Sequence, residues 1–568
     1  MSDFTEEQLS AIEAEGRTIV SASAGSGKTT VMIEKMIRLI RDKNVDVKNI
    51  LAVTYTKKAA ASMKEKLRKA LIKAMNDPAT SKEKYERLKT QHRQVALADI
   101  STIHSFCAKL IRTHFYATDV GNRFGIIAED DADGTSLRNQ AVENIFEQAY
   151  AEGNEDFKKL LSVFFRKKKD DTLKKIILET HSKVRTHVDY REELLASGKD
   201  SDELFDEICK ECFSWYAQKC KYYREQLSPL YATFEKYGRA DIAKHCGLLM
   251  DVLNEWMDAG DLFTLATMPT KTLPDKTKPQ VDPNQDAPEV LSAYAQMERL
   301  QEKIKDKMNG QERKVVATRE EERKNFSLAA ELAQPLAKFV LRFDDEYMRL
   351  KKLRGVLDYN DLEHYALALL NREEIANELA KKYTYVFVDE YQDVNPVQEA
   401  LISRIGGENL FLVGDVKQAI YGFRGSKSKF FVEKQKEFAD GVGNNLYMSR
   451  NFRSSDKVLD AVNAQFTLAM TPRVCAVDYA RGSYMDKGGM YALNDGNVQI
   501  YFVGKEERGT SSEERGVYSV RAETGKKSND VSAIAKVIRQ IIDKEVLKQS
   551  DSERIRLAVN SRTDIDKQ

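Results

Sequence analysis

Five short apolar runs, each closed by a polar or glycine-rich turn, most constrain how this chain folds. They are RTIVSAS, NILAVTYT, YTYVFVDE, NLFLVGD and NNLYMS, and they fall in two blocks, residues 17–106 and 383–450. Strand-like runs that alternate with amphipathic helical stretches predict a parallel sheet covered by helices. The sequence therefore predicts an α/β fold.

A long stretch of charged, helix-forming sequence separates the two blocks. Runs such as NQAVENIFEQAY and LAAELAQPLAKFVLRFDDEYMRLKKL carry an apolar stripe at helical spacing. This pattern predicts a large α-helical domain inserted into the α/β domain. Within it, residues 267–290 hold five of the ten prolines, a composition that predicts an exposed linker or a disordered loop.

Two segments near the end of the sequence have their own predictions. Residues 505–530 are polar and punctuated by glycine, which favours a second loop. Residues 555–568, IRLAVNSRTDIDKQ, are typical of a strand followed by the opening of a helix. That unfinished α/β unit leads us to expect a fragment of a longer protein.

Composition limits the classes of protein that the chain resembles. A length of 568 residues, 42% hydrophobic and 32% charged, indicates a soluble protein of several domains. No run approaches the roughly 20 apolar residues of a membrane helix, and MSDFTEEQLS lacks signal-peptide features, so we expect a cytoplasmic protein without membrane contact. With 90 basic and 89 acidic residues, any nucleic-acid surface must be a local patch or a stacking groove.

The six cysteines do not suggest a disulfide framework. Cys209 and Cys212, with Cys220, His245 and Cys246 downstream, admit a zinc site or a helical core. The apolar residues around the first pair recur at helical spacing. We therefore favour the core, with both thiols of the pair on one buried face.

The stretch SASAGSGKTT, residues 21–30, lies between an apolar run and a helix. It fits the phosphate-loop pattern G-x-x-x-x-G-K-[ST] except that Ala22 replaces the first glycine. Backbone N–H groups of such a loop surround phosphate oxygens at a helix N-terminus, Lys28 is expected to reach the β- and γ-phosphates, and Thr29 to ligate Mg²⁺. ATP and Mg²⁺ are the predicted cofactors. The predicted nucleotide-binding residues are Ala22, Ser23, Ala24, Gly25, Ser26, Gly27, Lys28, Thr29 and Thr30.

A carboxylate pair follows the apolar run YVFV. Asp389 is expected to hold Mg²⁺ through water, and Glu390 to orient or deprotonate the attacking water. An acidic loop at a strand end is common by itself. Together with a phosphate loop in the same chain, it predicts an ATPase.

An ordered series of motifs resembles the UvrD/Rep group of superfamily 1 DNA helicases: FTEEQ, ASAGSGKTT, VTYTKKAAASM, ISTIHSFC, VDEYQD, LVGDVKQAIYGFRGS and SRNFRSS. ISTIHSFCAKLIR, VLDYNDLEHYAL and NFRSSDKVLDAVN are more similar to AddA-type subunits of bacterial helicase–nucleases, which resemble RecB. GFRGS departs from that subgroup, in which a second arginine and no glycine are expected. A more general UvrD-like relative is the alternative.

The resemblance implies roles for further residues of the nucleotide site. Gln8 matches the glutamine that reads adenine, and Phe452 would pack on the adenine ring. Gln418 would sense the γ-phosphate, and Arg453 would reach that phosphate from the second motor domain. The catalytic residues so implied are Lys28, Asp389, Glu390, Gln418 and Arg453.

The resemblance also implies a surface for single-stranded or duplex-end DNA. Tyr421 and Phe423 match aromatic residues that stack on bases, which is a contact indifferent to base identity. His104 is expected to be a hydrogen-bonding or coupling residue rather than a metal ligand or general base. The further DNA-binding residues so implied are Tyr55, Thr56, Lys57, Lys58, Thr102, His104 and Arg424.

The implied protein is an ATP-dependent 3′-to-5′ DNA helicase of double-strand-break repair and recombination, with an AddB-like partner. The implied fold is a RecA-like P-loop NTPase sheet with a large inserted α-helical domain and an incomplete second RecA-like domain. Because motifs V and VI and the nuclease domain are missing, we expect ATP binding, poor hydrolysis and no unwinding. The alternative is an ATP-binding module that docks an AddB-like partner without unwinding. The expected limits are 1–118 and 345–445 for the first motor domain, 119–344 for the insertion and 446–568 for the start of the second motor domain.

Overall fold

The computed structural model describes residues 4–165, 170–268, 279–305, 308, 318–470, 479 and 484–488. The predictions for residues 505–530 and 555–568 lie outside these ranges. The chain groups into two compact units. One comprises Met1–Ala22 and Lys28–Met448, and the other comprises Ser23–Gly27 and the residues from Ser449 onward.

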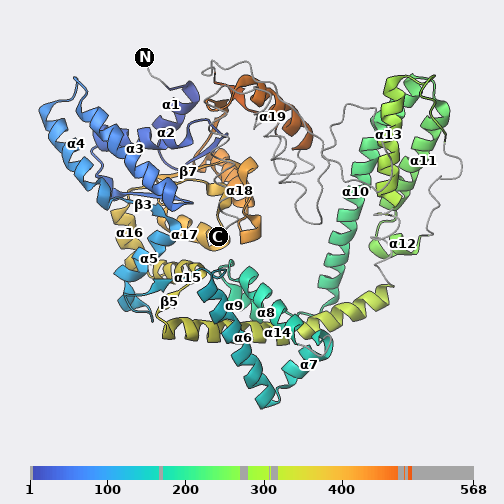
Figure 1. Ribbon diagram of the computed structural model, residues 1–568, viewed down its shortest axis with the longest axis horizontal. Coiled ribbons are helices and arrows are strands. Elements are labelled where there is room, and N and C mark those ends of the chain that lie inside the picture. The colour runs from blue at the N-terminus through green and yellow to red at the C-terminus, as the bar shows by residue number, and fades with distance from the viewer. Residues whose placement is uncertain are drawn as a thin grey trace, which may run out of the picture. The chain divides into compact units, whose positions relative to one another are not determined.

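The first unit is built on a sheet of six parallel strands (Figure 1). Its spatial order is β3-β2-β6-β7-β1-β8. All five predicted apolar runs form strands of this sheet, so the predicted parallel α/β sheet is confirmed. The strands are β1 (Thr18–Ala22), β2 (Ile50–Thr54), β3 (Asp99–Thr102), β6 (Tyr385–Val388), β7 (Leu410–Gly414) and β8 (Asn444–Met448).

Helices cover both faces of the sheet, and each face has its own core. Successive strand residues point to opposite faces, so Ile19 and Val53 belong to one core and Val20 and Ala52 to the other. The first core includes α5 (Ile103–Thr113), α15 (Tyr359–Leu370), α16 (Glu373–Lys382), α17 (Pro396–Ile405) and α18 (Lys429–Glu437). The second includes α1 (Glu6–Glu13), α2 (Lys28–Asp42), α3 (Lys57–Met75) and α4 (Lys82–Gln94), the last two lying side by side in Figure 1.

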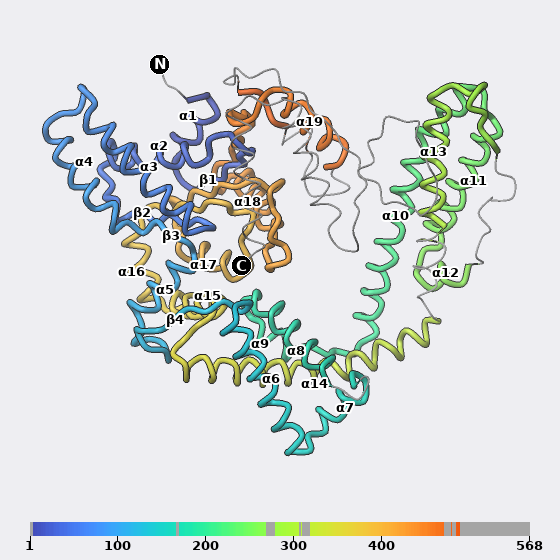
Figure 2. The backbone as a smooth tube through the Cα atoms, viewed as in Figure 1, coloured from blue at the N-terminus to red at the C-terminus, as the bar shows by residue number. Residues whose placement is uncertain are grey.

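The helical stretch between the two blocks begins and ends at a small two-stranded sheet. β4 (Gly125–Ile126) pairs in parallel with β5 (Val356–Leu357), where the chain leaves and rejoins the α/β part. Two apolar cores lie between these strands. One joins α6 (Ala132–Glu152), α7 (Glu155–Phe164), α8 (Asp171–Val184), α9 (Tyr190–Leu195) and α14 (Arg319–Leu353). The other joins α10 (Asp202–Lys236), α11 (Ala240–Met257), α12 (Leu262–Thr267) and α13 (Pro288–Lys303), of which α10, α11 and α13 lie side by side (Figure 2).

Two local expectations differ from the structure. Cys212 is exposed and Cys209 half-buried, so the expected common buried face is wrong. The two thiols do share a helical stripe with Tyr216, but the core that covers this stripe begins at Tyr216. In the proline-rich stretch, residues 279–287 are anchored, since Arg239 binds the Gln280 carbonyl (2.8 Å), and Pro288 starts α13. Residues 269–278 lie outside the described ranges.

The second unit contributes fewer described elements. Its strands β9 (Arg450–Asn451) and β10 (Asp486–Lys487) pair in parallel, and α19 (Asp456–Ala469) follows β9. Buried Asn463 on α19 donates to the Met485 carbonyl (2.9 Å), which ties the helix to the segment before β10. Among the described helices of both units, none is long and apolar enough to cross a membrane.

A buried ion network joins the helical insertion to α15. Arg185, which follows α8, donates to Asp361 Oδ1 (2.8 Å) near the start of α15. The same guanidinium donates to the Tyr190 hydroxyl (2.7 Å), which donates to Asp344 on α14 (2.8 Å). Lys351 on α14 pairs with Asp361 at 2.5 Å. Each buried charge therefore has an opposite partner, which such burial requires.

Replacing Arg185 with methionine is expected to destabilise the first unit strongly. The Arg185→Met variant leaves Asp361 and Asp344 buried with fewer counter-charges, and loss of one partner of a buried pair costs about 3–5 kcal/mol. The control is Arg349→Met, because the Arg349–Glu346 pair is largely exposed and is worth at most about 1 kcal/mol. Thermal unfolding followed by circular dichroism measures both. Equal melting temperatures for the two variants would contradict the assignment.

Candidate functional site

Most of the predicted site residues lie at one edge of the six-stranded sheet. Because all six strands are parallel, their carboxyl ends meet at this edge, where ligands of open α/β sheets bind. Tyr55 follows β2, His104 follows β3, and Asp389 follows β6. A cavity of about 370 Å³ lies among these three residues.

Lys28, the first residue of α2, points at the carboxylate pair. Its Nζ lies 3.6 Å from Glu390 Oε2 and is buried without a hydrogen bond from any residue that the structure describes. A buried ammonium lacking hydrogen-bond acceptors is costly. The phosphate oxygens of a nucleotide would supply acceptors at this position, so the residues present fit the predicted triphosphate.

Asp389 and Glu390 form a strained and electrostatically loaded pair. Burial, and then the charge of Glu390, raise the pKa of Asp389 to about 6, although Lys28 opposes the shift. Glu390 has φ of +54°, a left-handed conformation that costs a non-glycine residue free energy. Such perturbed carboxyls and strained residues gather at functional sites.

Gln392 connects the acidic pair to the next strand, and it was not among the residues predicted from the sequence. Its Nε2 donates to Glu390 Oε2 (2.9 Å), and its Oε1 accepts from the Asp415 N–H (2.9 Å) after β7. Gly414 has no room for a side chain, because a Cβ there would lie 2.4 Å from Gln392 Oε1. Asp415 Oδ2 in turn accepts from Gln418 Nε2 (2.7 Å). The only sequence signal was an amide between the carboxylates of DEYQD.

In the second unit, the phosphate-loop residues Ser23–Gly27 contact the NFRSS motif. Asn451 donates from Nδ2 to the Ala24 carbonyl (2.7 Å) and accepts at Oδ1 from the Arg453 N–H (2.8 Å). Gly25 has φ of +73°, and a Cβ on it would lie 2.8 Å from both Asn451 Oδ1 and the Arg453 Cβ. Asn451 is thus a second site residue that was not predicted from the sequence.

The remaining nucleotide-site predictions stay predictions. Gln8 forms a capping box at the start of α1, in which its Oε1 accepts from the Thr5 N–H (3.1 Å). Thr29 and Thr30 lie in the first turn of α2. In the second unit, the Phe452 N–H donates to the Gly25 carbonyl (2.9 Å).

The predicted base-stacking residues form one aromatic cluster. The rings of Tyr55 and Tyr421 stack with centroids 4.5 Å apart, and Phe423 lies 6.0 Å from Tyr421. Phe423 is 80% exposed. The Arg424 guanidinium lies 5.7 Å from the ring centres of both Tyr421 and Phe423. Exposed rings beside a cation are the side chains that stack on single-stranded bases.

Gly425 explains why GFRGS departs from the expected motif. The residue has φ of +82°, which favours glycine. A Cβ at this position would also lie 2.6 Å from Thr186 Cγ2, in the helical insertion. The glycine therefore lets the insertion approach the aromatic loop closely.

Helix N-termini supply an anion-binding contribution near the aromatic cluster. Thr56 caps α3 by accepting from the Ala59 N–H (3.1 Å), and Thr102 caps α5 in the same way. Lys57 and Lys58 are exposed in the first turn of α3. Two lysines beside a helix N-terminus form a surface that favours anions such as a phosphate backbone.

His104 has a fixed hydrogen-bond partner. Its Nε2 lies 2.8 Å from Oε1 of buried Glu363, and its ring lies 4.7 Å from that of Tyr359. Among the described residues, no group of three or more His, Cys, Asp or Glu side chains has metal-binding geometry. The structure thus gives His104 a partner suited to the predicted hydrogen-bonding role.

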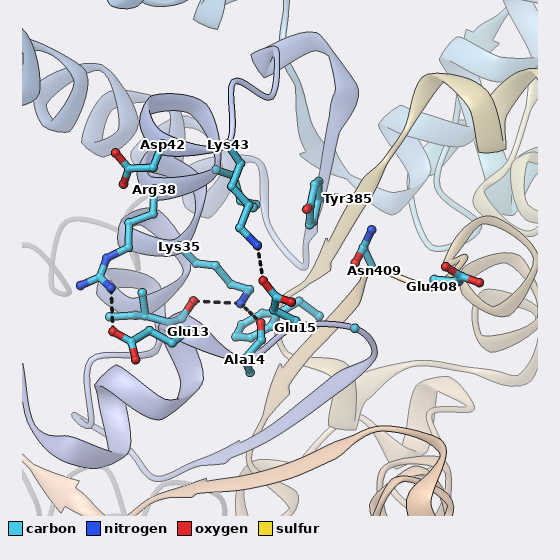
Figure 3. Close-up of a pocket in the computed structure, with 14 residues that line it drawn as sticks. Glu13, Ala14, Glu15, Lys35, Arg38, Asp42, Lys43, Tyr385, Glu408 and Asn409 are labelled. Atoms are coloured by element: carbon cyan, nitrogen blue, oxygen red, sulfur yellow. Dashed lines mark hydrogen bonds and ion pairs between the residues drawn. The ribbon is translucent and has the colours of Figure 1, made fainter. Parts of the chain in front are cut away.

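A second cavity of about 540 Å³ lies between α1, α2 and the chain before β7. Figure 3 shows Lys35 and Lys43 pointing toward residues 13–15. Lys35 donates to the Ile12 carbonyl (2.9 Å) and the Ala14 carbonyl (2.5 Å), and Lys43 pairs with Glu15. Burial lowers the pKa of Lys35 to about 8. These contacts fasten the end of α1 onto α2, so the polar groups here serve the fold.

Replacing Asp389 with asparagine is expected to stabilise the ligand-free chain above pH 6. The folded-state pKa of about 6 exceeds that of an unfolded Asp, about 3.9. Ionised Asp389 therefore destabilises the fold, by an amount that grows from about pH 4 to 6 and is complete above pH 6. We expect Asp389→Asn to gain about 1–3 kcal/mol at pH 7.5 and nothing near pH 4.

Urea unfolding across that pH range, with the surface change Asp440→Asn as control, measures this effect. A loss of stability for Asp389→Asn at pH 7.5 would show that the carboxylate is a net stabilising group.

Comparison with known proteins agrees with this geometry. Residues 4–439 match the family model described as UvrD/REP helicase N-terminal domain. The chain is similar to the AddA subunit of the ATP-dependent helicase/nuclease of Carboxydothermus hydrogenoformans, with 32% identity over 87% of this chain and 42% of the relative. The proteins of the same name from Alkaliphilus metalliredigens (30% identity; 89% and 42%) and Natranaerobius thermophilus (32%; 84% and 39%) are similar to the same extent.

The chain spans about two fifths of the length of these curated relatives. All three carry the AddA name, so the expected resemblance to AddA-type subunits is confirmed. The family match covers both blocks of strands and the helical insertion between them. The chain belongs to the UvrD/REP helicase family.

Proposed function

We propose that this chain is the part of an ATP-dependent DNA helicase that binds ATP and grips single-stranded DNA. The observation that carries the proposal is the shared cavity at the carboxyl edge of the sheet. Its walls include Asp389 and Glu390 as well as Tyr55, His104 and Arg424. A change in the acidic pair on nucleotide binding is therefore felt directly by the surface proposed for DNA.

For the nucleotide, each residue has a proposed task. The N–H groups of Ser23–Gly27 cradle phosphates, and Lys28 neutralises the β- and γ-phosphates. Thr29 and Asp389 would hold Mg²⁺, which supplies charge neutralisation of the phosphates when bound. Glu390 takes the proton of the attacking water, held in place by Gln392.

Further nucleotide contacts are proposed from the family pattern. Gln418 senses the γ-phosphate, and its amide is oriented by Asp415. Arg453 stabilises the transferring phosphoryl charge, a task worth roughly 10³–10⁵ in rate in related enzymes. Gln8 and Phe452 hold the adenine.

For DNA, the aromatic cluster and the nearby basic helix end have complementary tasks. Bases stack on Tyr421 and Phe423, which supplies sequence-independent affinity. Lys57 and Lys58 contact the phosphate backbone, with Thr56, Thr102 and Arg424 beside them.

The wider assignments also belong to this proposal. We place the first motor domain at residues 1–118 and 345–445, the inserted helical domain at 119–344 and the start of a second motor domain at 446–568. We propose 3′-to-5′ movement in double-strand-break repair and recombination, with an AddB-like second subunit. The support for these assignments is the family match and the name of the relatives, which describes each as one subunit of a helicase/nuclease.

Lys28→Ala is expected to weaken binding of a non-hydrolysable ATP analogue about 10- to 150-fold. The change removes charge-assisted hydrogen bonds worth about 1.5–3 kcal/mol. Fluorescence titration of the 568-residue chain measures the affinity, and exposed Lys48→Ala is the control. Undiminished binding by Lys28→Ala would refute the proposed nucleotide site.

Tyr421→Ala is expected to weaken binding of fluorescent oligo(dT) roughly 5- to 150-fold, since stacking is worth about 1–3 kcal/mol per base. Its salt dependence should stay unchanged because no charge is lost. Lys57→Ala should instead reduce the slope of log affinity against log salt by about 0.7. The exposed Tyr237→Ala is the control. A chain that ignores oligonucleotide but captures a partner subunit would favour the non-motor alternative.

A further inference from the structure

Glu363 is a buried anion with three hydrogen-bond donors around it. Its side chain on α15 is 2% exposed. Oε1 accepts from Gln398 Nε2 (2.6 Å) and lies 2.8 Å from His104 Nε2, and Oε2 accepts from Asn395 Nδ2 (2.9 Å). These contacts hold the pKa of Glu363 below its usual value despite burial. The ionised carboxylate only accepts, so His104 carries a proton on Nε2.

Two of these donors belong to the segment that follows the acidic pair. Asn395 and Gln398 form the capping box of α17, in which the Gln398 N–H donates to Asn395 Oδ1 (2.8 Å). The short helix Tyr391–Asp393 links this cap to Glu390, and Gln392 within it donates to Glu390. Few freely rotating bonds therefore separate Glu390 from the donors on Glu363.

The third donor belongs to the proposed DNA surface. His104 lines the same cavity as Tyr55 and Arg424. Its side chain is 32% exposed, and its ring rests against Tyr359. Because Nε2 faces Glu363, the opposite edge of the ring is the one left to face the cavity.

The aromatic loop is fastened to the same segment. The Lys427 N–H donates to the Val394 carbonyl (3.0 Å), two residues after Gln392 and one before Asn395. Residues 391–398 thus contact the acidic pair, the aromatic loop and, through Glu363, His104. Such a segment is suited to carry a displacement from one site to the other.

We propose that Glu363 is a positioning residue that couples the nucleotide site to the DNA surface. It holds His104 in register with residues 391–398, so a nucleotide-dependent movement of the acidic pair also moves His104. Glu363 contacts neither ligand itself. This inference rests on the proposed function, and it adds the physical link between that function's two sites.

The test is Glu363→Gln, which keeps size and shape but offers one acceptor oxygen to three donors. The affinity of a non-hydrolysable ATP analogue is measured with and without saturating oligo(dT), and the affinity for oligo(dT) with and without the analogue. Linkage requires the two ratios to be equal. We expect a ratio of about 5–150 in the unaltered chain, falling to within about twofold of one in the variant, while each affinity measured alone changes less than about threefold.

A purely structural role for Glu363 predicts a different outcome. Both single-ligand affinities or the melting temperature would fall, while the ratio would stay at the unaltered value. That result overturns the inference. Glu373→Gln, an exposed change on neighbouring α16, is the matched control and should leave every quantity unaltered.

A second variant covers the case in which Glu363→Gln does not fold. Gln398→Met removes the donor of α17 to Glu363 but leaves Asn395 and His104 in place, and it should also lower the ratio, by at least about threefold. An unaltered ratio in Gln398→Met overturns the inference. Failure of the proposed function has a separate signature, namely a ratio of one in the unaltered chain.

Discussion

The parallel direction of all six strands is the constraint on which the rest of the structure depends. It brings the carboxyl ends of β2, β3, β6 and β7 to one edge, although up to about 280 residues of chain separate β3 from β6. At that edge, helix N-termini and strand-end side chains meet without any further folding device. The proposed nucleotide and DNA contacts are neighbours for this reason alone.

Polar groups at the edge are held at an energetic cost. Lys28 has no hydrogen bond from the described residues, Asp389 titrates with a pKa of about 6, and Glu390 has a left-handed backbone. A protein selected only for stability would remove such features. Their presence together in the ligand-free chain is what a site built for an anionic, metal-bearing ligand requires, because that ligand supplies the missing partners.

Around this loaded pair, neighbouring polar groups are fully satisfied. Gln392 joins two strand ends, and Glu363 joins α5, α15 and α17 through three donors. Low dielectric strengthens such networks and penalises any that are incomplete. The buried Arg185 network extends the same principle to the helical insertion, where the close approach of Thr186 to Gly425 places the insertion against the aromatic loop.

The sequence by itself determined the parallel sheet, the helical character of the insertion, the family and the candidate residues of the phosphate loop and acidic pair. Those features follow from local periodicity and from motifs with fixed spacing. Gln392, Asn451, Arg185 and Glu363 escaped sequence reasoning because their partners lie far along the chain or act through side-chain geometry that no spacing encodes. The exposure of Cys212 escaped it too, since helical periodicity identifies a stripe but only the packed neighbours decide how far along the helix it is covered. Long-range contacts, which only the tertiary structure provides, decided those positions.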